Sequence, residues 1–399
     1  MKTEAVHKDF HIEVNCQQRN HDGERICGDV FIHKRVKEEN RIVAVLSDGM
    51  GHGVKANMLA TLTSTMAANF TEEHKDFVKI AEIIMNTLPV CSERKISYAT
   101  FTIVDIEIEG KVSILEYDNP ETFILRENQM FEPGWQCIIL NTEKNQGKEL
   151  RSCSFVPQKE DRIVFCSDGI TQSGLGSDQF LLGWGRDSLV DFVIGEVKKN
   201  DNISAQDLGE RVVKKAVQND GFVSKDDTSC AVIYFREPRK MLICTGPPYE
   251  QENDKVYAEK VKAFTGKKVL CGATTGDIIS REWSKEITDT FDFDDPELPP
   301  VSFMDGVDLI TEGILTLTKV SNILKDFNHQ TALEKGPADQ IVKMILQSDE
   351  IDFIVGTRIN IAHQDPSLPV ELEIRRTVVK RIAVILEEKF LKEVKIEFL

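Results

Sequence analysis

The fold is decided by residues Arg41–Met66, whose sequence is RIVAVLSDGMGHGVKANMLATLTSTM. A short apolar and β-branched run opens this stretch and predicts a strand, and apolar residues at helical spacing follow it. Between the two stands Asp48, and then a turn that consists largely of glycine and histidine. The sequence thus places one carboxylate at the tip of a strand, beside backbone that carries almost no side chains.

Three other aspartates adjoin predicted strands in a similar way: Asp29 in CGDVF, Asp168 in CSDGI and Asp226 in KDDTS. Hard divalent cations bind carboxylate and carbonyl oxygens, and a glycine beside an aspartate lets the backbone approach a metal without a Cβ clash. Two cations about 3.5 to 4 Å apart activate a water and hold the oxygens of a phosphoryl group. One Asp-Gly pair is usually only a turn, so it is the repetition at strand ends that indicates a metal site.

The composition is that of a soluble globular protein, and a length of 399 residues predicts two domains. The net charge of −17 argues against nucleic acid or an anionic membrane as the main partner. No run approaches the roughly 20 apolar residues that a membrane span needs. The nine cysteines lack C-x-x-C spacing and the N-terminus lacks a signal-peptide pattern, so we expect reduced thiols in a cytoplasmic protein.

The first part of the chain predicts antiparallel sheets with helices packed on their outside. The predicted strands cover 10–18, 26–34, 41–47, 98–108, 111–117, 122–128 and 161–167. The predicted helices cover 53–70, 78–88 and 204–218. In the first of these helices Leu59, Leu62, Met66 and Phe70 fall on one stripe, as in an amphipathic helix.

The pattern changes near Pro238, where we place a domain boundary. Beyond it, strands of nearly continuous apolar character alternate with helices, which predicts a mainly parallel α/β layer. The predicted strands lie within 240–246, 267–276, 298–306 and 351–360, and the predicted helices cover 308–324 and 368–390. The two predicted domains are therefore 1–237 and 238–399.

Four motifs in this order, GERICGD, VLSDGMGHGVKA, FCSDGITQSG and KDDTSCAVIYF, carry a resemblance. Over roughly the first 237 residues the chain resembles the metal-dependent protein phosphatase (PPM) family, specifically its bacterial SpoIIE branch. The resemblance implies an α+β fold, an αββα sandwich of antiparallel sheets flanked by helices. It also implies a site for two divalent cations, Mn²⁺ or Mg²⁺, that hydrolyses phosphoserine or phosphothreonine.

The resemblance implies a role for each aspartate. Asp48 would bridge the two metals, and Gly49 would give its backbone carbonyl oxygen to one of them. Asp168 and Asp226 would hold the other metal. Asp29 would bind the metal on the Gly49 side, directly or through water.

Three further residues have alternatives that the sequence leaves open. Asp227 is a metal ligand in place of its neighbour if the alignment shifts by one residue, and otherwise belongs to a capped turn. Arg25 stands four residues before Asp29, so on a strand both would face the same side, and the guanidinium would grip the substrate phosphate. The alternative for Arg25 is a solvated surface residue. His52 is either a general acid near the metals or simply the start of the helix.

By resemblance the substrate is a phosphoprotein, and an anti-anti-sigma-like regulator is the best candidate. One alternative is a catalytically quiet regulatory scaffold, and another is a phosphatase that acts on a small phosphorylated metabolite. Three roles are open for the second domain, 238–399: sensing a ligand, docking the phosphoprotein and forming a homodimer.

In the second domain, KKVLCGATTGDIISREW predicts a strand, a Gly/Thr turn and a helix that presents backbone N–H groups to an anion. It is neither a dinucleotide-binding fingerprint nor a P-loop. A pocket formed by Thr274, Thr275, Asp305 and His363 would lie at strand ends. Ordinary turn chemistry explains each of the four residues separately.

Overall fold

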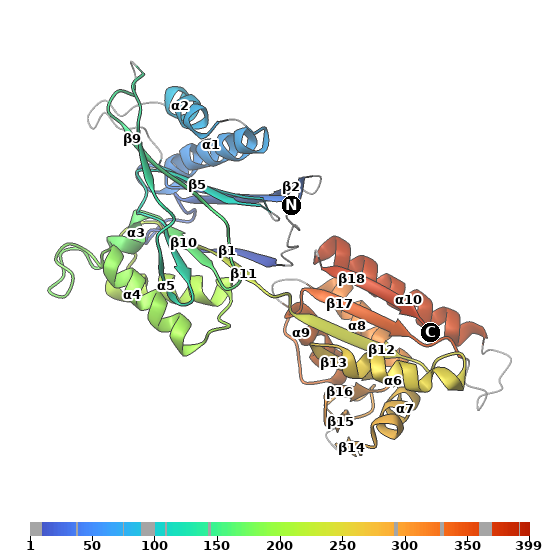
Figure 1. Ribbon diagram of the computed structural model, residues 1–399. Coiled ribbons are helices and arrows are strands. Elements are labelled where there is room, and N and C mark those ends of the chain that lie inside the picture. The colour runs from blue at the N-terminus through green and yellow to red at the C-terminus, as the bar shows by residue number, and fades with distance from the viewer. Residues whose placement is uncertain are drawn as a thin grey trace. The chain divides into compact units, whose positions relative to one another are not determined.

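The computed structural model describes residues 10–36, 39–74, 76–88, 100–107, 110–142, 145–290, 294–327, 331–358, 369–390 and 392–399. The chain forms two compact units, Met1–Glu237 and Pro238–Leu399 (Figure 1). Within the described part of the chain, each helix is too short or too polar to cross a membrane.

The first unit contains two antiparallel sheets. One sheet has the strand order β2 (Val30–Val36), β3 (Arg41–Ser47), β4 (Phe101–Glu107), β5 (Val112–Tyr117), β9 (Glu149–Phe155) and β8 (Gln136–Ile139). The other has the order β1 (His11–Arg19), β11 (Thr228–Arg236), β10 (Arg162–Cys166), β6 (Phe123–Arg126) and β7 (Gln129–Phe131). Side chains such as Ile114, Phe165 and Ile233 fill the core between the sheets.

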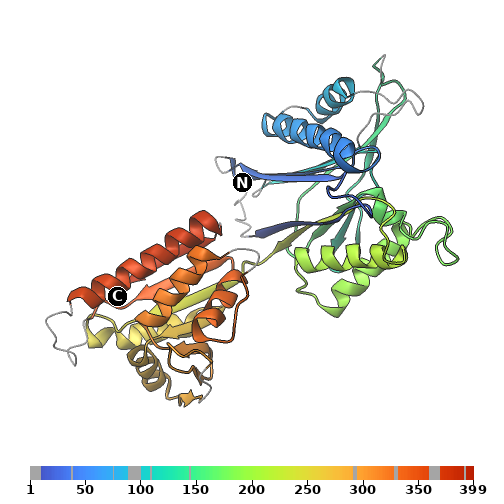
Figure 2. The same cartoon turned by 180° about the vertical axis from the view of Figure 1, so that it is seen from behind.

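Helices cover the outer face of each sheet (Figures 1 and 2). The first sheet packs against α1 (Gly53–Glu72) and α2 (Phe77–Thr87). The second packs against α4 (Arg186–Lys199) and α5 (Ala205–Asn219), and the short α3 (Asp168–Thr171) follows β10. The predicted αββα sandwich is confirmed.

The predicted apolar stripe of α1 is only partly correct. Met66 and Phe70 pack against the core, whereas Leu62 is 45% exposed. The fully buried face of the helix consists of small residues such as Ala60 and Ala67, which let the helix axis approach the sheet closely. Helical spacing predicts which residues share a face of the helix, but it does not predict how closely that face approaches the neighbouring sheet.

The second unit is built on one seven-stranded, mostly parallel sheet. Its order is β14 (Thr288–Asp289), β15 (Ser302–Met304), β16 (Val307–Thr311), β13 (Lys267–Cys271), β12 (Lys240–Thr245), β17 (Glu350–Val355) and β18 (Glu393–Phe398). The last five strands in this order run parallel, and the first two pair antiparallel at the edge. The predicted α/β domain with a mainly parallel sheet is confirmed.

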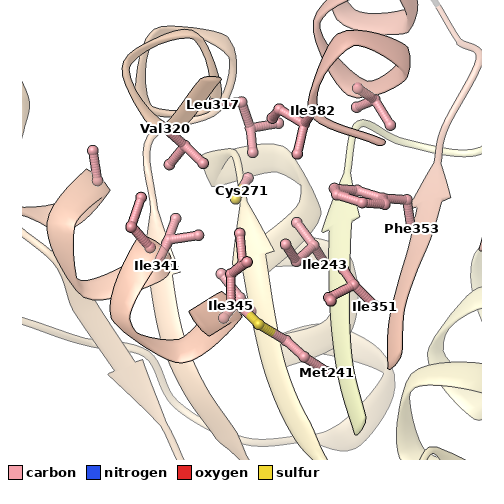
Figure 3. Packing of buried hydrophobic residues seen from close by; sticks show 14 of the residues in the cluster. Met241, Ile243, Cys271, Leu317, Val320, Ile341, Ile345, Ile351, Phe353 and Ile382 are labelled. Atoms are coloured by element: carbon pink, nitrogen blue, oxygen red, sulfur yellow. The ribbon is translucent and has the colours of Figure 1, made fainter. Parts of the chain in front are cut away.

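Both faces of this sheet are covered by helices. One face packs against the helices α8 (Ile314–Asp326), α9 (Pro337–Leu346) and α10 (Pro369–Lys389). The other face packs against α6 (Asp254–Ala263) and α7 (Ala273–Trp283), the former preceded by the 3₁₀ turn Gln251–Asn253. In Figure 3 Ile243 and Phe353 point from the strands toward Leu317 and Ile382 of the helices, and Met241 points toward Ile345 of α9. Burial on two sides explains why these strands are apolar almost throughout.

Two expectations for this unit are wrong. The helix predicted over 308–324 begins only after Gly313, because the residues before it form β16, a run too short for its periodicity to separate strand from helix. The pocket that was to join Thr275 with Asp305 does not form. Asp305 lies in the turn before β16, whereas Thr275 lies beyond the carboxyl end of the parallel strand β13, at the opposite edge of the sheet. His363 lies outside the described residues.

Candidate metal centre

Strand pairing brings the aspartates to one end of the sandwich. Asp48 directly follows β3 and Asp29 directly precedes β2, and these strands pair so that Val30 lies opposite Ser47. In the other sheet Asp168 follows β10, and the Asp226–Asp227 pair precedes the neighbouring strand β11. Each sheet therefore contributes carboxylates to the same end.

A hydrogen bond joins the two groups across the sheets. The Ser229 hydroxyl of β11 donates to Asp29 Oδ2 over 2.6 Å, and Gln18 Nε2 of β1 donates to the Ser229 Oγ over 3.0 Å. Asp29 is only 2% exposed. The carboxylate that belongs to one sheet is thus held by a side chain of the other.

The carboxyl groups act on one another. Burial raises the pKa of Asp48 well above its ordinary value, and the charges of Asp29, Asp168 and Asp226 raise it further. Burial likewise raises the pKa of Asp29 to about 7, although hydrogen bonds from serine hydroxyls oppose the rise. The pKa of Asp226 is raised to about 6 by burial and then by the charge of Asp168.

The donor set fits hard cations. Asp29 Oδ1 and Asp227 Oδ2 are buried and have no hydrogen-bond partner. No lysine or arginine is among the groups that mainly shift the pKa of Asp48 or of the other aspartates in the cluster. Carboxylate oxygens without a cationic side chain beside them are the ligands that Mg²⁺ and Mn²⁺ accept.

The site is not a preassembled ligand sphere. Across the described ranges, no three histidine, cysteine, aspartate or glutamate side chains converge closely enough to form a ready-made metal site. The cluster is recognised instead by the effect of neighbouring aspartates on the pKa of Asp48 and by buried carboxylate oxygens that have no hydrogen-bond partner.

Glycines beside the aspartates are required by packing. A Cβ on Gly49 would lie 2.1 Å from the carbonyl oxygen of Ala56 in α1, and one on Gly169 would lie 2.2 Å from that of Asp227. A Cβ on Gly28 would lie 2.6 Å from Asp227 Oδ2. The repeated Asp-Gly pairs therefore bring backbone into contact with backbone around the carboxylates.

The two Asp226–Asp227 carboxylates face different groups. Asp226 is close enough to act on Asp48, and its Oδ1 accepts the Asp227 N–H. Asp227 is 2% exposed, and its Oδ1 accepts the His21 N–H over 3.0 Å. Both residues therefore border the cluster, since the charge of Asp227 acts on Asp29, and Asp227 in addition fastens the loop between β1 and β2.

Arg25 and His52 lie outside the carboxylate cluster. Arg25 is exposed in the loop that precedes β2, so the expectation that it shares a strand face with Asp29 is wrong. His52 is the N-cap residue of α1, and its Nδ1 lies 2.8 Å from Glu24 Oε1. Its ring stacks on that of His21 at 4.4 Å between centroids. His52 thus reaches the cluster only through a neighbour.

Several residues at the site escaped the sequence argument. Gln172 Nε2 donates to Asp168 Oδ2 over 2.8 Å, and Asp118 is close enough to Asp168 for its own pKa to be raised, after the larger effect of burial. The helical i, i+4 spacing of Gln172 was a usable signal. Asp118 and His21 gave none, because their positions depend on loops from other parts of the chain.

The comparisons with known proteins agree with this architecture. Residues 38–236 match the family model described as Stage II sporulation protein E (SpoIIE). The N-terminal unit belongs to the SpoIIE family. No match was found among the curated proteins.

Solved structures resemble the SpoIIE unit. The SpoIIE phosphatase domain from Bacillus subtilis, in a crystal form without domain swapping, is 15% identical with a TM-score of 0.42, and the match covers 58% of this chain and 95% of that one. Another Bacillus subtilis SpoIIE structure, which adds a fragment of the regulatory domain, is 16% identical with a TM-score of 0.45, over 57% and 64% of the two chains. RsbX in complex with magnesium is 17% identical with a TM-score of 0.40, over 56% and 96%.

Gly49→Ala is expected to lower the free energy of unfolding by about 1–3 kcal/mol, because the new Cβ would overlap the backbone of α1. Gly195→Ala in α4 is the matched control: its Cβ meets nothing within 4 Å, so it should raise stability by about 1 kcal/mol. Urea denaturation measures both changes. A Gly49→Ala protein as stable as the native one would contradict the packing argument.

Without metal, stability is expected to fall as pH rises from about 4 to about 7. The folded protein binds the Asp29 proton more tightly than the unfolded chain does, because the pKa of Asp29 is raised to about 7 by burial. That preference favours folding at low pH and is lost when the proton leaves. Urea denaturation in EDTA across this pH range measures the trend. Asp29→Asn should flatten it, and an equally steep trend in this variant would exclude Asp29 as its source.

Proposed function

We propose that this chain is a metal-dependent phosphatase that hydrolyses phosphoserine and phosphothreonine in a protein substrate. The observation that carries the proposal is the cluster of Asp29, Asp48, Asp168 and Asp226, whose buried or half-buried carboxyls are brought by strand pairing to one end of a SpoIIE-family sandwich. When bound there, two divalent cations, Mn²⁺ or Mg²⁺, would supply an activated water and neutralise the charge of the transferred phosphoryl group.

Each residue has a proposed role. Asp48, whose pKa responds to the other three aspartates, would help to hold both cations. The Gly49 carbonyl oxygen and Asp29, directly or through water, would hold one of them, and Asp168 and Asp226 would hold the other.

Asp226 is the better candidate of the adjacent pair. The charge of Asp226 raises the pKa of Asp48, and the pKa of Asp226 is itself raised by burial and by the charge of Asp168. Both effects fit a ligand that faces the cluster. Asp227 already accepts a backbone N–H from His21 and packs against Gly28. In this proposal Asp227 positions the loop and is not the main ligand.

Arg25 and His52 are proposed to act on the substrate and not on the cations. Arg25 is exposed on the same loop as Glu24, where a guanidinium can meet a phosphate oxygen as the substrate docks. Glu24 holds His52 by Nδ1, which leaves Nε2 to exchange a proton with the leaving oxygen.

Asp48→Asn is expected to lower kcat/KM by about a thousandfold, because the bridging carboxylate loses the charge that holds both cations. The measurement is hydrolysis of p-nitrophenyl phosphate and of a phosphoserine peptide, with Mn²⁺, with Mg²⁺ and in EDTA. Asp187→Asn is the matched control, since Asp187 is fully exposed in α4 and makes the same chemical change away from the cluster. It should keep full activity.

The outcomes separate the proposal from its alternatives. Turnover that persists in EDTA would exclude the metal mechanism. Absence of metal binding would favour a regulatory scaffold. Rapid turnover of small phosphate esters with none on phosphoproteins would favour a metabolite phosphatase, and a faster reaction on a phosphorylated anti-anti-sigma-like protein would support the proposed partner.

Ser229→Ala is expected to weaken metal binding by about tenfold, because Asp29 loses the hydroxyl that orients it. Isothermal titration with Mn²⁺ measures the affinity directly, without relying on activity. Ser188→Ala, at an exposed position of α4, serves as control and should bind as the native protein does. Equal affinities for all three proteins would remove Ser229 from the site.

A further inference from the structure

The second unit ends its central strands in glycine. Gly246, Gly272 and Gly356 directly follow β12, β13 and β17, and Gly313 stands two residues after β16. These strands are parallel, so all four turns lie at one edge of the sheet. In parallel α/β sheets, ligands bind beyond the carboxyl ends of the strands.

At this edge, the N-terminus of α7 is open. Its N-cap residue is Gly272, with φ of 125°, and no side chain caps the helix. The first helical hydrogen bond runs from the Gly276 N–H to the Gly272 carbonyl oxygen, so the N–H groups of the preceding turn point out of the helix. Ala273 is exposed to solvent. An open helix N-terminus favours an anion through these N–H groups and through the helix dipole.

Thr275 gives an independent indication of a ligand at this N-terminus. Its Oγ1 is fully buried and has no hydrogen-bond partner. The hydroxyl turns back to the mouth of the helix, where it lies 3.5 Å from the Cβ position of Gly272. A buried hydroxyl that stays unpaired has lost its hydrogen bonds to water, and an anion at the first turn would offer it an acceptor.

The neighbouring helix α8 has a similar N-terminus, and there a carboxylate binds the backbone N–H groups. The N-cap residue of α8 is also a glycine, Gly313, and a Cβ there would lie 3.5 Å from the Gly272 Cα. Here Glu312 Oε2 accepts the N–H groups of Leu315 and Thr316 over 3.0 and 3.3 Å. The chain thus fills one of two adjacent N-termini with its own carboxylate, and α7 has no such group.

We propose that the N-terminus of α7, with the Thr275 hydroxyl, binds the phosphate group of a small phosphate-bearing molecule. The Glu312 carboxylate at this edge already accepts two N–H groups of α8. The second unit is then a ligand-sensing domain. This proposal does not depend on the phosphatase activity of the first unit.

The test is hydrogen exchange of the full chain, followed by mass spectrometry, with inorganic phosphate or with adenosine monophosphate. Sodium chloride at equal ionic strength gives the baseline, and EDTA keeps metal out of the first unit. We expect exchange in peptides that cover Gly272–Ile279 to slow about threefold or more. Protection by both probes identifies any phosphate group as the ligand, and protection by the nucleotide alone identifies a phosphate ester.

Ala273→Glu places a carboxylate at the first turn of α7 and is expected to weaken phosphate binding about tenfold by repulsion. Because acidic residues suit a helix N-terminus, the variant should fold. Ser188→Glu is the matched control: it adds the same charge to the first turn of α4, whose N-cap is also an uncapped glycine, Gly185. It should leave the binding unchanged.

Thr275→Val separates a ligand contact from a structural role. Replacing an unpaired buried hydroxyl with a methyl group should leave stability equal or higher, while the phosphate affinity falls. The proposal is overturned if neither probe protects Gly272–Ile279 in the native chain, or if Ala273→Glu and Thr275→Val bind as the native chain does. Either result leaves metal-dependent hydrolysis by the first unit unaffected.

Discussion

The first unit is organised around carboxylates that are held close together at one end of the sandwich. Burial raises the cost of ionising Asp29, Asp48, Asp168 and Asp226, and the charges of neighbouring aspartates raise it further for Asp29, Asp48 and Asp226. Two sheets and their connecting backbone hold these groups in place against their repulsion. Ionised carboxylates at such a site need cations or hydrogen-bond donors to stabilise them, and the serine hydroxyls provide only some of the donors.

The surrounding architecture follows from this constraint. Glycines beside the aspartates let backbone pack within contact distance, and α1 presents small residues so that it can lie close behind Gly49. The far end of α1 is held by Arg41, whose guanidinium donates to the Thr71 carbonyl oxygen over 2.7 Å and to the Asp105 carboxylate over 2.6 Å. One helix is therefore fixed at the site by backbone contact and, at its other end, by a buried ion pair.

In the second unit the strands are buried on both faces, so the backbone N–H and C=O groups at the strand ends must find hydrogen-bond partners in the turns. At β16 the chain does this with Glu312, which caps α8. At β13 the first turn of α7 has no such carboxylate. The buried hydroxyls of Thr275 and, at the equivalent position of α8, of Thr316 both lack partners. The turns before α7 and α8 are adjacent and similar, and they differ in one carboxylate. Because of that carboxylate the N-terminus of α8 is capped, whereas the N-terminus of α7 is not.

The sequence by itself determined the two architectures, the strand ends that carry Asp48 and Asp168, and the glycines beside them, because periodicity and turn chemistry are local. It did not determine which face of α1 is buried, that Arg25 lies in a loop, or that Asp305 lies at the edge opposite Thr275. Nor did it show that Ser229 holds Asp29, 200 residues away. Those facts depend on how closely layers approach and which strands pair. Only the tertiary structure decides them, because they arise from contacts between segments distant in the chain.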